Sequence, residues 1–213
     1  MNRFAALLGA SGSESERADR LRWALGSGFG ELTLIHPLPG ISLGWSGDAG
    51  LTALARTDDA FALAHGSAHP VLGIEASGIC VDDACGIAYR ALGRLISSDS
   101  TVAGLAGSYI VVAGCSDGRV QVAGDGSGNR APYCSVAGRE LAVASHPLVC
   151  ARLRGQAQLD RALEDFFLVY GFLPSRRTLF RGVEQLAPGE VYSMDPSGWR
   201  LDRAPSDLSL IHI

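Results

Sequence analysis

Short apolar runs dominate the first part of the chain. Each run is bounded by Gly, Pro, Ser or Asp, which is typical of strands in a mainly antiparallel sheet. The pattern predicts strands at Phe4–Leu8, Leu32–His36, Ile41–Trp45, Phe61–Ala64 and Val71–Ile74.

Other segments place their apolar residues at helical spacing. In the clearest example, Ile87, Leu92 and Leu95 recur at the spacing that lines one face of a helix. Gly171 stands where a later helical pattern stops, and glycine is a common residue at helix ends. The pattern predicts helices over Glu14–Leu25, Asp83–Leu95, His146–Leu153 and Leu159–Gly171.

The residues from Tyr109 to Ser145 have the pattern of a meander. Four apolar stretches, SYIVVAGC, RVQVAGD, APYCSVAG and ELAVAS, are separated by turn signals such as Asp117-Gly118. We expect four consecutive strands joined by short turns. Because helices alternate with groups of strands, the chain predicts an α+β or a layered αββα architecture.

Composition narrows the class of protein. The 213 residues are 47% hydrophobic and 19% charged, as expected for one well-packed core rather than a disordered chain. The net charge of -4 and the scattered arginines predict no nucleic-acid partner. All 18 basic residues are arginine, which excludes a phosphate-loop lysine, a Schiff base and a serine-lysine pair.

The cysteines and the N-terminus bear on location. The five cysteines form no CxxC pair and mostly sit in apolar runs, which is typical of a reducing cytosol. Met1–Leu8 lacks the pattern of a secretory signal, and no run is long enough for a membrane helix. We therefore predict a cytoplasmic protein without a membrane partner.

Three groups of residues resemble a hydrolase site, a zinc site and a nucleotide-binding loop, but each lacks a required part. His65 and His69 flank Ser67, but no nucleophile elbow or third group accompanies them. Cys80 and Cys85 lack the second thiol pair of a zinc site, so we predict no metal. The glycine-rich loop at 123–129 lies between two predicted strands with no helix after it, unlike a nucleotide-binding loop.

The segment Leu159–Gly198 carries the most specific motif. A predicted helix is followed by GFLP, by TLFRGV and by LAPG, in which Pro188-Gly189 form a turn before a strand at Glu190–Met194. This order resembles the junction of asparagine synthetases and their relatives, where the glutaminase-like domain leads into the synthetase domain. The resemblance implies a glutaminase-like domain at 1–155 and a junction helix with an extended segment at 156–206.

A second motif lies upstream. Asp125-x-x-Gly128-x-Arg130-x-Pro132-Tyr133, followed by ELAVAS, is similar to the meander of the same family. The resemblance implies structural roles for Asp125, Gly128, Arg130 and Tyr133, and equally for Pro188 and Gly189. It also implies the fold: a four-layer αββα sandwich of two mainly antiparallel sheets, as in Ntn hydrolases and class II glutamine amidotransferases.

The family's glutaminase residues are not matched. Its nucleophile is a cysteine directly after Met1, whereas this sequence has Asn2, so the resemblance implies no catalytic residue. The family's Asn-Gly-Glu corresponds to His65-Gly66-Ser67, which lacks the carboxylate for the glutamine ammonium. Asp82 or Asp83 is aligned with an acidic glutamine-binding position, with a helix N-cap as the alternative role.

Such losses resemble lasso-peptide cyclases and β-lactam synthetases, which activate a carboxylate as an adenylate. The resemblance implies that the parent protein is an ATP-dependent ligase, while this chain alone is no enzyme. ATP and Mg are expected in a missing C-terminal synthetase domain, because no Ser-Gly-Gly-x-Asp-Ser loop occurs here. A lasso system further implies a precursor peptide with its protease or leader-binding protein. No cofactor is expected in this chain.

The last residues, 207–213, break the composition of the preceding chain, and we expect a non-native or truncated end there. The apolar segment Phe166–Phe180 is expected to be exposed where the missing domain packs. Two alternatives remain open. The first is a working glutamine amidotransferase whose true start lies elsewhere and bears a cysteine. The second is a stand-alone binding module, which a stop codon directly after Ile213 favours.

Overall fold

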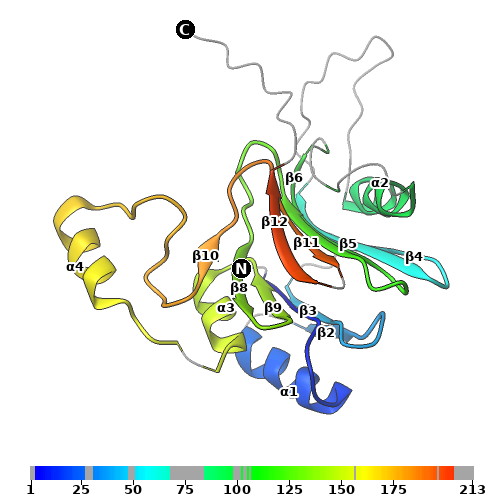
Figure 1. Ribbon diagram of the computed structural model, residues 1–213, viewed down its shortest axis with the longest axis horizontal. Helices are drawn as coiled ribbons and strands as arrows, with labels where there is room; N and C mark the ends of the chain where they lie inside the picture. Colours follow the sequence, from blue (N-terminus) through cyan, green and yellow to red (C-terminus); the bar gives the residue numbers. More distant parts are fainter. Residues whose placement is uncertain are drawn as a thin grey trace, which may run out of the picture.

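The computed structural model describes residues 3–26, 31–47, 51–67, 84–97, 102, 105, 107–155, 157–195 and 197–203. Within these ranges the chain forms two six-stranded antiparallel sheets that stack face to face, with helices outside them (Figure 1). The predicted α+β class with αββα layers is therefore confirmed.

The first sheet has the strand order β10-β8-β9-β1-β3-β2. Its central strand β1 pairs with β3 on one side and with β9 on the other, so the start of the chain lies in the middle of the sheet. The strands are β1 (Arg3–Leu8), β2 (Leu32–Ile35), β3 (Ser42–Ser46), β8 (Tyr133–Ala137), β9 (Glu140–Ala144) and β10 (Glu184–Gln185).

The second sheet has the order β12-β11-β7-β6-β5-β4. Its longest pairing joins β5 and β6, which run antiparallel from Ala60 opposite Cys115 to Ser67 opposite Ser108. The strands are β4 (Thr52–Arg56), β5 (Ala60–Ser67), β6 (Ser108–Cys115), β7 (Val120–Gly124), β11 (Glu190–Asp195) and β12 (Gly198–Arg203).

Three helices cover the outer faces of the sheets. α1 (Glu14–Leu25) and α3 (Pro147–Leu153) bury their apolar sides against the first sheet, and α2 (Ala84–Ser97) buries its side against the second. α1 begins with a capping box in which Ser13 and Glu16 bond each other's backbone N–H, which explains its sharp start.

The layer between the sheets is filled by the inward side of each strand. On β5, Ala60, Ala62 and Ala64 face α2, whereas Phe61 and Leu63 face the first sheet. At one end, which we call the closed end, these buried apolar side chains pack together: Leu8, Ile41, Phe61, Val112, Val120 and Leu141.

The predicted meander is wrong as a single unit. β6 and β7 form a hairpin in the second sheet, whereas β8 and β9 form a hairpin in the first. The connection from Asp125 to Pro132 therefore crosses between the sheets instead of making a short turn.

Most other predicted elements are confirmed with ends that differ by up to three residues, and three strands of the described ranges were missed: β4, β12 and the two-residue β10. β4 buries only Ala55 and alternates weakly, while β12 exists through its pairing with β11. The predicted strand Val71–Ile74 lies outside the described residues. Strands β10 to β12 come from the predicted junction segment and join both sheets, and the division at residue 155 stays a prediction.

α4 (Arg161–Tyr170) stands apart from the sheets (Figure 1). It belongs to an excursion whose base is closed by two backbone hydrogen bonds, from Asp160 N to Leu179 O and from Arg181 N to Gln158 O. The predicted helix and its end at Gly171 are confirmed, because Gly171 is left-handed with φ 74°.

The expected exposure of apolar side chains from Phe166 onwards is observed on this helix and just after it. Only Leu163 is buried, and the exposed fraction of Leu168 reaches 76%. The neighbouring large side chains Phe167, Val169, Tyr170 and Phe172 are exposed too. Among the described residues, no helix is long and apolar enough to cross a membrane.

Candidate functional site

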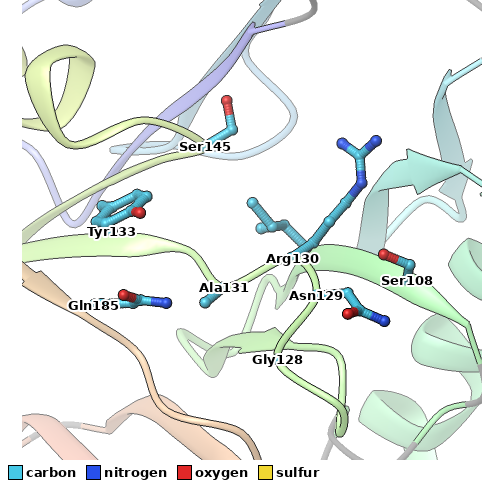
Figure 2. Close-up of a pocket in the computed structure, with 9 residues that line it drawn as sticks. Ser108, Gly128, Asn129, Arg130, Ala131, Tyr133, Ser145 and Gln185 are labelled. Carbon is cyan, nitrogen blue, oxygen red and sulfur yellow. The ribbon is translucent and has the colours of Figure 1, made fainter. Parts of the chain in front are cut away.

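A cavity of about 610 Å³ lies at the end of the inter-sheet layer opposite the closed end. We call this the open end. Strands of both sheets and the crossing loop line the cavity, and Figure 2 shows the Arg130 side chain rising from the loop into the space between Ser145 and Ser108. The lining residues are Ser108, Ile110, Gly128, Asn129, Arg130, Ala131, Tyr133, Ser145 and Gln185.

The crossing loop is organised around the carboxylate of Asp125, which is 1% exposed. Oδ1 accepts hydrogen bonds from the backbone N–H of Ser127 (3.0 Å) and Asn129 (3.1 Å) and from the Ser127 hydroxyl (2.6 Å). Oδ2 accepts from the backbone N–H of Arg130 (2.6 Å). Asp125 thus fixes the direction in which Arg130 leaves the loop.

Gly128 and Pro188 meet at the outer side of the same loop. Gly128 has φ +74°, and a Cβ there would lie 2.8 Å from Pro188 Cγ, so glycine is required for both conformation and space. Pro188 and Gly189 form a turn closed by the bond from Glu190 N to Ala187 O (3.0 Å). The two motifs singled out in the sequence are therefore in contact.

Ser145 ties the start of β1 to the cavity. The Phe4 N–H donates to Ser145 Oγ (2.9 Å), and the Ser145 N–H donates to the Phe4 carbonyl (3.0 Å). β1 begins at Arg3, so the N-terminal end of this strand lies beside the cavity wall. Asn2, the predicted position of the absent nucleophile, lies outside the described residues.

His65 occupies the inward side near the end of β5 and is 1% exposed. Its ring stacks on Phe4 with centroids 5.6 Å apart, and Nδ1 lies 2.8 Å from Thr52 Oγ1. Nε2 is buried and has no hydrogen-bond partner within the described part of the chain. Burial, aided by the nearby Arg130 guanidinium, lowers the pKa of His65 to about 4, so the ring is neutral at pH 7.

Two solved structures are similar to this chain. The first is described as the allosteric regulatory enzyme of purine biosynthesis, with a TM-score of 0.53 and 11% identity over 94% of this chain and 48% of that chain. This chain has the fold of a class II glutamine amidotransferase domain. The likeness extends to the fold alone.

The second structure is glutamine phosphoribosylpyrophosphate (PRPP) amidotransferase from B. subtilis complexed with ADP and GMP. It aligns with a TM-score of 0.49 and 12% identity over 94% of this chain and 49% of that chain. The chain thus spans about half the length of the solved structures it matches. No protein-family model matches the sequence, and no curated protein matches it significantly.

The amidotransferase fold brings some predicted positions to the cavity and leaves others elsewhere. Arg130 and Tyr133 line it, and His65 lies at the same end of the layer. Gly66 instead serves strand packing, since a Cβ there would clash with the Ser108 carbonyl oxygen and lie 2.8 Å from the Tyr109 Cα. The backbone of Ser67 pairs with Ser108. Asp82 and Asp83 lie outside the described residues.

None of the four cysteines that the structure describes lines the cavity. Cys134 and Cys150 are buried in the first sheet and α3, and burial raises the pKa of both thiols, that of Cys150 to about 12. Cys115 lies at the far end of β6, and Cys85 lies in the first turn of α2. These thiols are poorly placed and, where buried, poorly ionised for nucleophilic chemistry.

Sequence reasoning missed several lining residues. Asn129 and Gln185 were not singled out, and Ser108 and Ser145 appeared only as letters of larger motifs. A signal was present for the two serines, because each follows the inward alternation of its strand and replaces an apolar residue at the strand end. Inward polar residues at the same end of several strands indicate a site.

Proposed function

We propose that this chain is a glutaminase-like domain without glutaminase activity. It would form the front part of an asparagine-synthase-like, ATP-dependent amide-bond-forming enzyme of the lasso-peptide-cyclase kind. One observation carries the proposal: the amidotransferase-type cavity beside the start of β1 is lined by hydroxyls, amides and Arg130, and by no thiol of the described residues.

The requirements of an N-terminal nucleophile support the proposed absence of glutaminase activity. An N-terminal-nucleophile glutaminase needs a thiolate at the first residue and an amine beside it as the base. The sequence has Asn2 there, whose side-chain amide is no nucleophile. The cavity hydroxyls of Ser108 and Ser145 have no base within hydrogen-bonding distance among the described residues, and Ser145 Oγ already bonds the Phe4 backbone.

The α4 excursion supports a role as part of a larger enzyme. Phe167, Leu168, Val169, Tyr170 and Phe172 form an exposed apolar patch, and patches of this kind mark surfaces that other domains cover. Phe166 packs against Tyr170 and Phe172, with centroids 4.5 Å and 5.6 Å apart, which gives the patch a fixed shape. In the proposal, the synthetase domain covers this patch.

The proposal also places the chemistry outside this chain. ATP and Mg would bind the synthetase domain, which would adenylate a carboxylate, and a precursor peptide with its protease or leader-binding protein would be the partners. The enzyme would act in the cytoplasm, where the cysteines stay reduced.

A glutaminase assay tests the loss of activity. The full chain is incubated with L-glutamine, and released glutamate is measured against heat-denatured protein. We expect no release above the blank. Release that is proportional to native protein would instead establish a working amidotransferase.

The parent enzyme is tested at the level of the gene. The reading frame beyond the Ile213 codon is determined in an independent clone of the locus. A frame that continues through a Ser-Gly-Gly-x-Asp-Ser loop supports the amide ligase. A stop codon directly after Ile213 favours the stand-alone binding module.

A further inference from the structure

The open end of the inter-sheet layer holds the positive charge of the Arg130 guanidinium. Among the residues that the structure describes, no acidic side chain pairs with the Arg130 guanidinium, which projects into the cavity (Figure 2). The nearest acid along the chain, Asp125, is turned towards the loop and bonds the backbone N–H groups of Ser127, Asn129 and Arg130. A partly buried cation in this setting favours an anion from solution.

The other lining groups are neutral and polar. Ser108, Ser145 and Tyr133 present hydroxyls, and Asn129 and Gln185 present amides. A second polar atom at this end also lacks a partner in the described part of the chain, since Nε2 of the 1% exposed His65 is unbonded. One cation surrounded by neutral donors and acceptors matches a ligand with a single negative charge and further polar atoms.

The geometry of the cation favours a carboxylate. The planar guanidinium donates two parallel N–H bonds to the two oxygens of a carboxylate, which fixes both distance and orientation. The volume of about 610 Å³ is in the range of small-molecule sites, so a small organic molecule fits beyond the carboxylate.

Among the residues that the structure describes, the surroundings of Arg130 disfavour a free amino acid. Its ammonium group would lie within a few atoms of the carboxylate, and hence close to Arg130. The described lining residues offer no carboxylate to it, and the neighbouring His65 ring offers no negative charge. A buried ammonium without a counter-charge is costly.

We infer that the cavity binds a small organic carboxylate with no free ammonium beside it, such as an N-acylated amino acid or the carboxyl end of a peptide, through Arg130. The inference does not depend on the proposed function, because it rests on the lining of the cavity in this chain.

Isothermal titration calorimetry on the full chain tests this with matched probes. N-acetylglycine carries the carboxylate, N-acetylglycinamide lacks it, and L-glutamine adds the ammonium. We expect saturable binding of N-acetylglycine, with the amide and glutamine bound about tenfold more weakly or worse, as for the loss of a charge-assisted pair. Absence of saturable N-acetylglycine binding, or equal binding of the amide or glutamine, overturns the inference.

Inorganic phosphate and two variants complete the experiment. Arg130→Gln should weaken N-acetylglycine binding about tenfold or more. Arg161→Gln, on the exposed surface of α4, makes the same charge change and should leave binding unaltered. Thermal unfolding verifies that both variants fold. Phosphate binding as tight as N-acetylglycine, or an unaffected Arg130→Gln variant, contradicts a carboxylate site. Binding and glutamate release are separate readouts, so this inference and the proposed function fail independently.

Discussion

The two ends of the inter-sheet layer are built from the same strands but differ in chemistry. At the closed end, the inward side chains of β1, β5 and β9 are Leu8, Phe61 and Leu141, all almost completely buried. At the open end, the same alternation continues with His65 on β5 and with Ser145, which directly follows β9.

The difference shows how one layer supplies both stability and a site. Apolar burial at the closed end contributes the free energy that holds the sheets together. The open end places polar groups between the same sheets, which is costly unless each group is bonded, and Nε2 of His65 is not bonded within the described residues. We therefore expect substitutions to have different effects at the two ends.

The largest effect is expected at the closed end. Phe61→Ala removes a side chain that is 1% exposed and leaves a cavity, which should cost about 3–5 kcal/mol of unfolding free energy. Leu168→Ala on α4 removes a side chain that is mostly in solvent, and should change the same quantity by less than about 0.5 kcal/mol. Urea denaturation measures both, and equal losses would contradict the distinction between core and patch.

The next effect concerns acid stability at the open end. The pKa of His65 is about 4 in the folded protein and 6.5 ordinarily, so the unfolded chain binds more protons between these values. The contribution of neutral His65 to the free energy of unfolding is therefore fully present above pH 6.5. It should be lost as the pH decreases to 4, which lowers the free energy of unfolding by up to about 3 kcal/mol.

Denaturation midpoints of His65→Gln and the native chain across pH 4 to 7 test this. The variant should lose the part of the pH dependence that belongs to His65. Leu168→Ala, which removes no titratable group, serves as the control and should keep the pH dependence of the native chain. Parallel pH profiles for the native chain and His65→Gln would show that the histidine is not responsible.

Asp125→Asn should have a smaller effect, about 2 kcal/mol. The change preserves shape but replaces a charged acceptor of several N–H bonds by an amide. The loop that positions Arg130 should then loosen, which is visible as faster amide exchange at Ser127, Asn129 and Arg130. Unchanged exchange at these amides would mean that the carboxylate does not organise the loop.

The smallest effect is expected at the junction of Ser145 with β1. Ser145→Ala removes the acceptor of the Phe4 N–H and should cost about 1 kcal/mol. Ser116→Ala removes a long bond, 3.4 Å, between exposed groups and should cost almost nothing. Thermal unfolding of the two variants measures both costs. A cost for Ser145→Ala no greater than that for Ser116→Ala would show that the bond between Phe4 and Ser145 does not stabilise the start of β1.

Much of the fold could be predicted because it depends on local patterns. The apolar runs gave most strands, and the spacing of Ile87, Leu92 and Leu95 gave α2. The resemblance to asparagine synthetases led to the αββα layers. The edge strand β4 was not predicted because it buries a single residue, Ala55. β12 was not predicted because its stability comes from pairing with β11.

The site was less predictable because it depends on distant contacts. Consecutive hairpins look alike in sequence whether they share a sheet or not. In the folded chain, the loop that crosses between the sheets is shaped by the bonds from Asn129 N and Arg130 N to the Asp125 carboxylate. Ser108 and Ser145 become neighbours of one cavity only after both sheets have formed. The exposed apolar side chains of α4, by contrast, agree with the expectation from the sequence.

The position of β1 in the middle of the first sheet has a consequence for biosynthesis. Phe4 and Ser145 are 141 residues apart in the sequence, yet they are directly hydrogen-bonded. β9 pairs with the edge of β1 that faces away from β3. A chain that leaves the ribosome from its N-terminus can pair β1 with β3 early, but keeps the other edge of β1 open until β9 has emerged. Open edges recruit foreign strands. Most of the domain must therefore be synthesised before it can protect its own first strand.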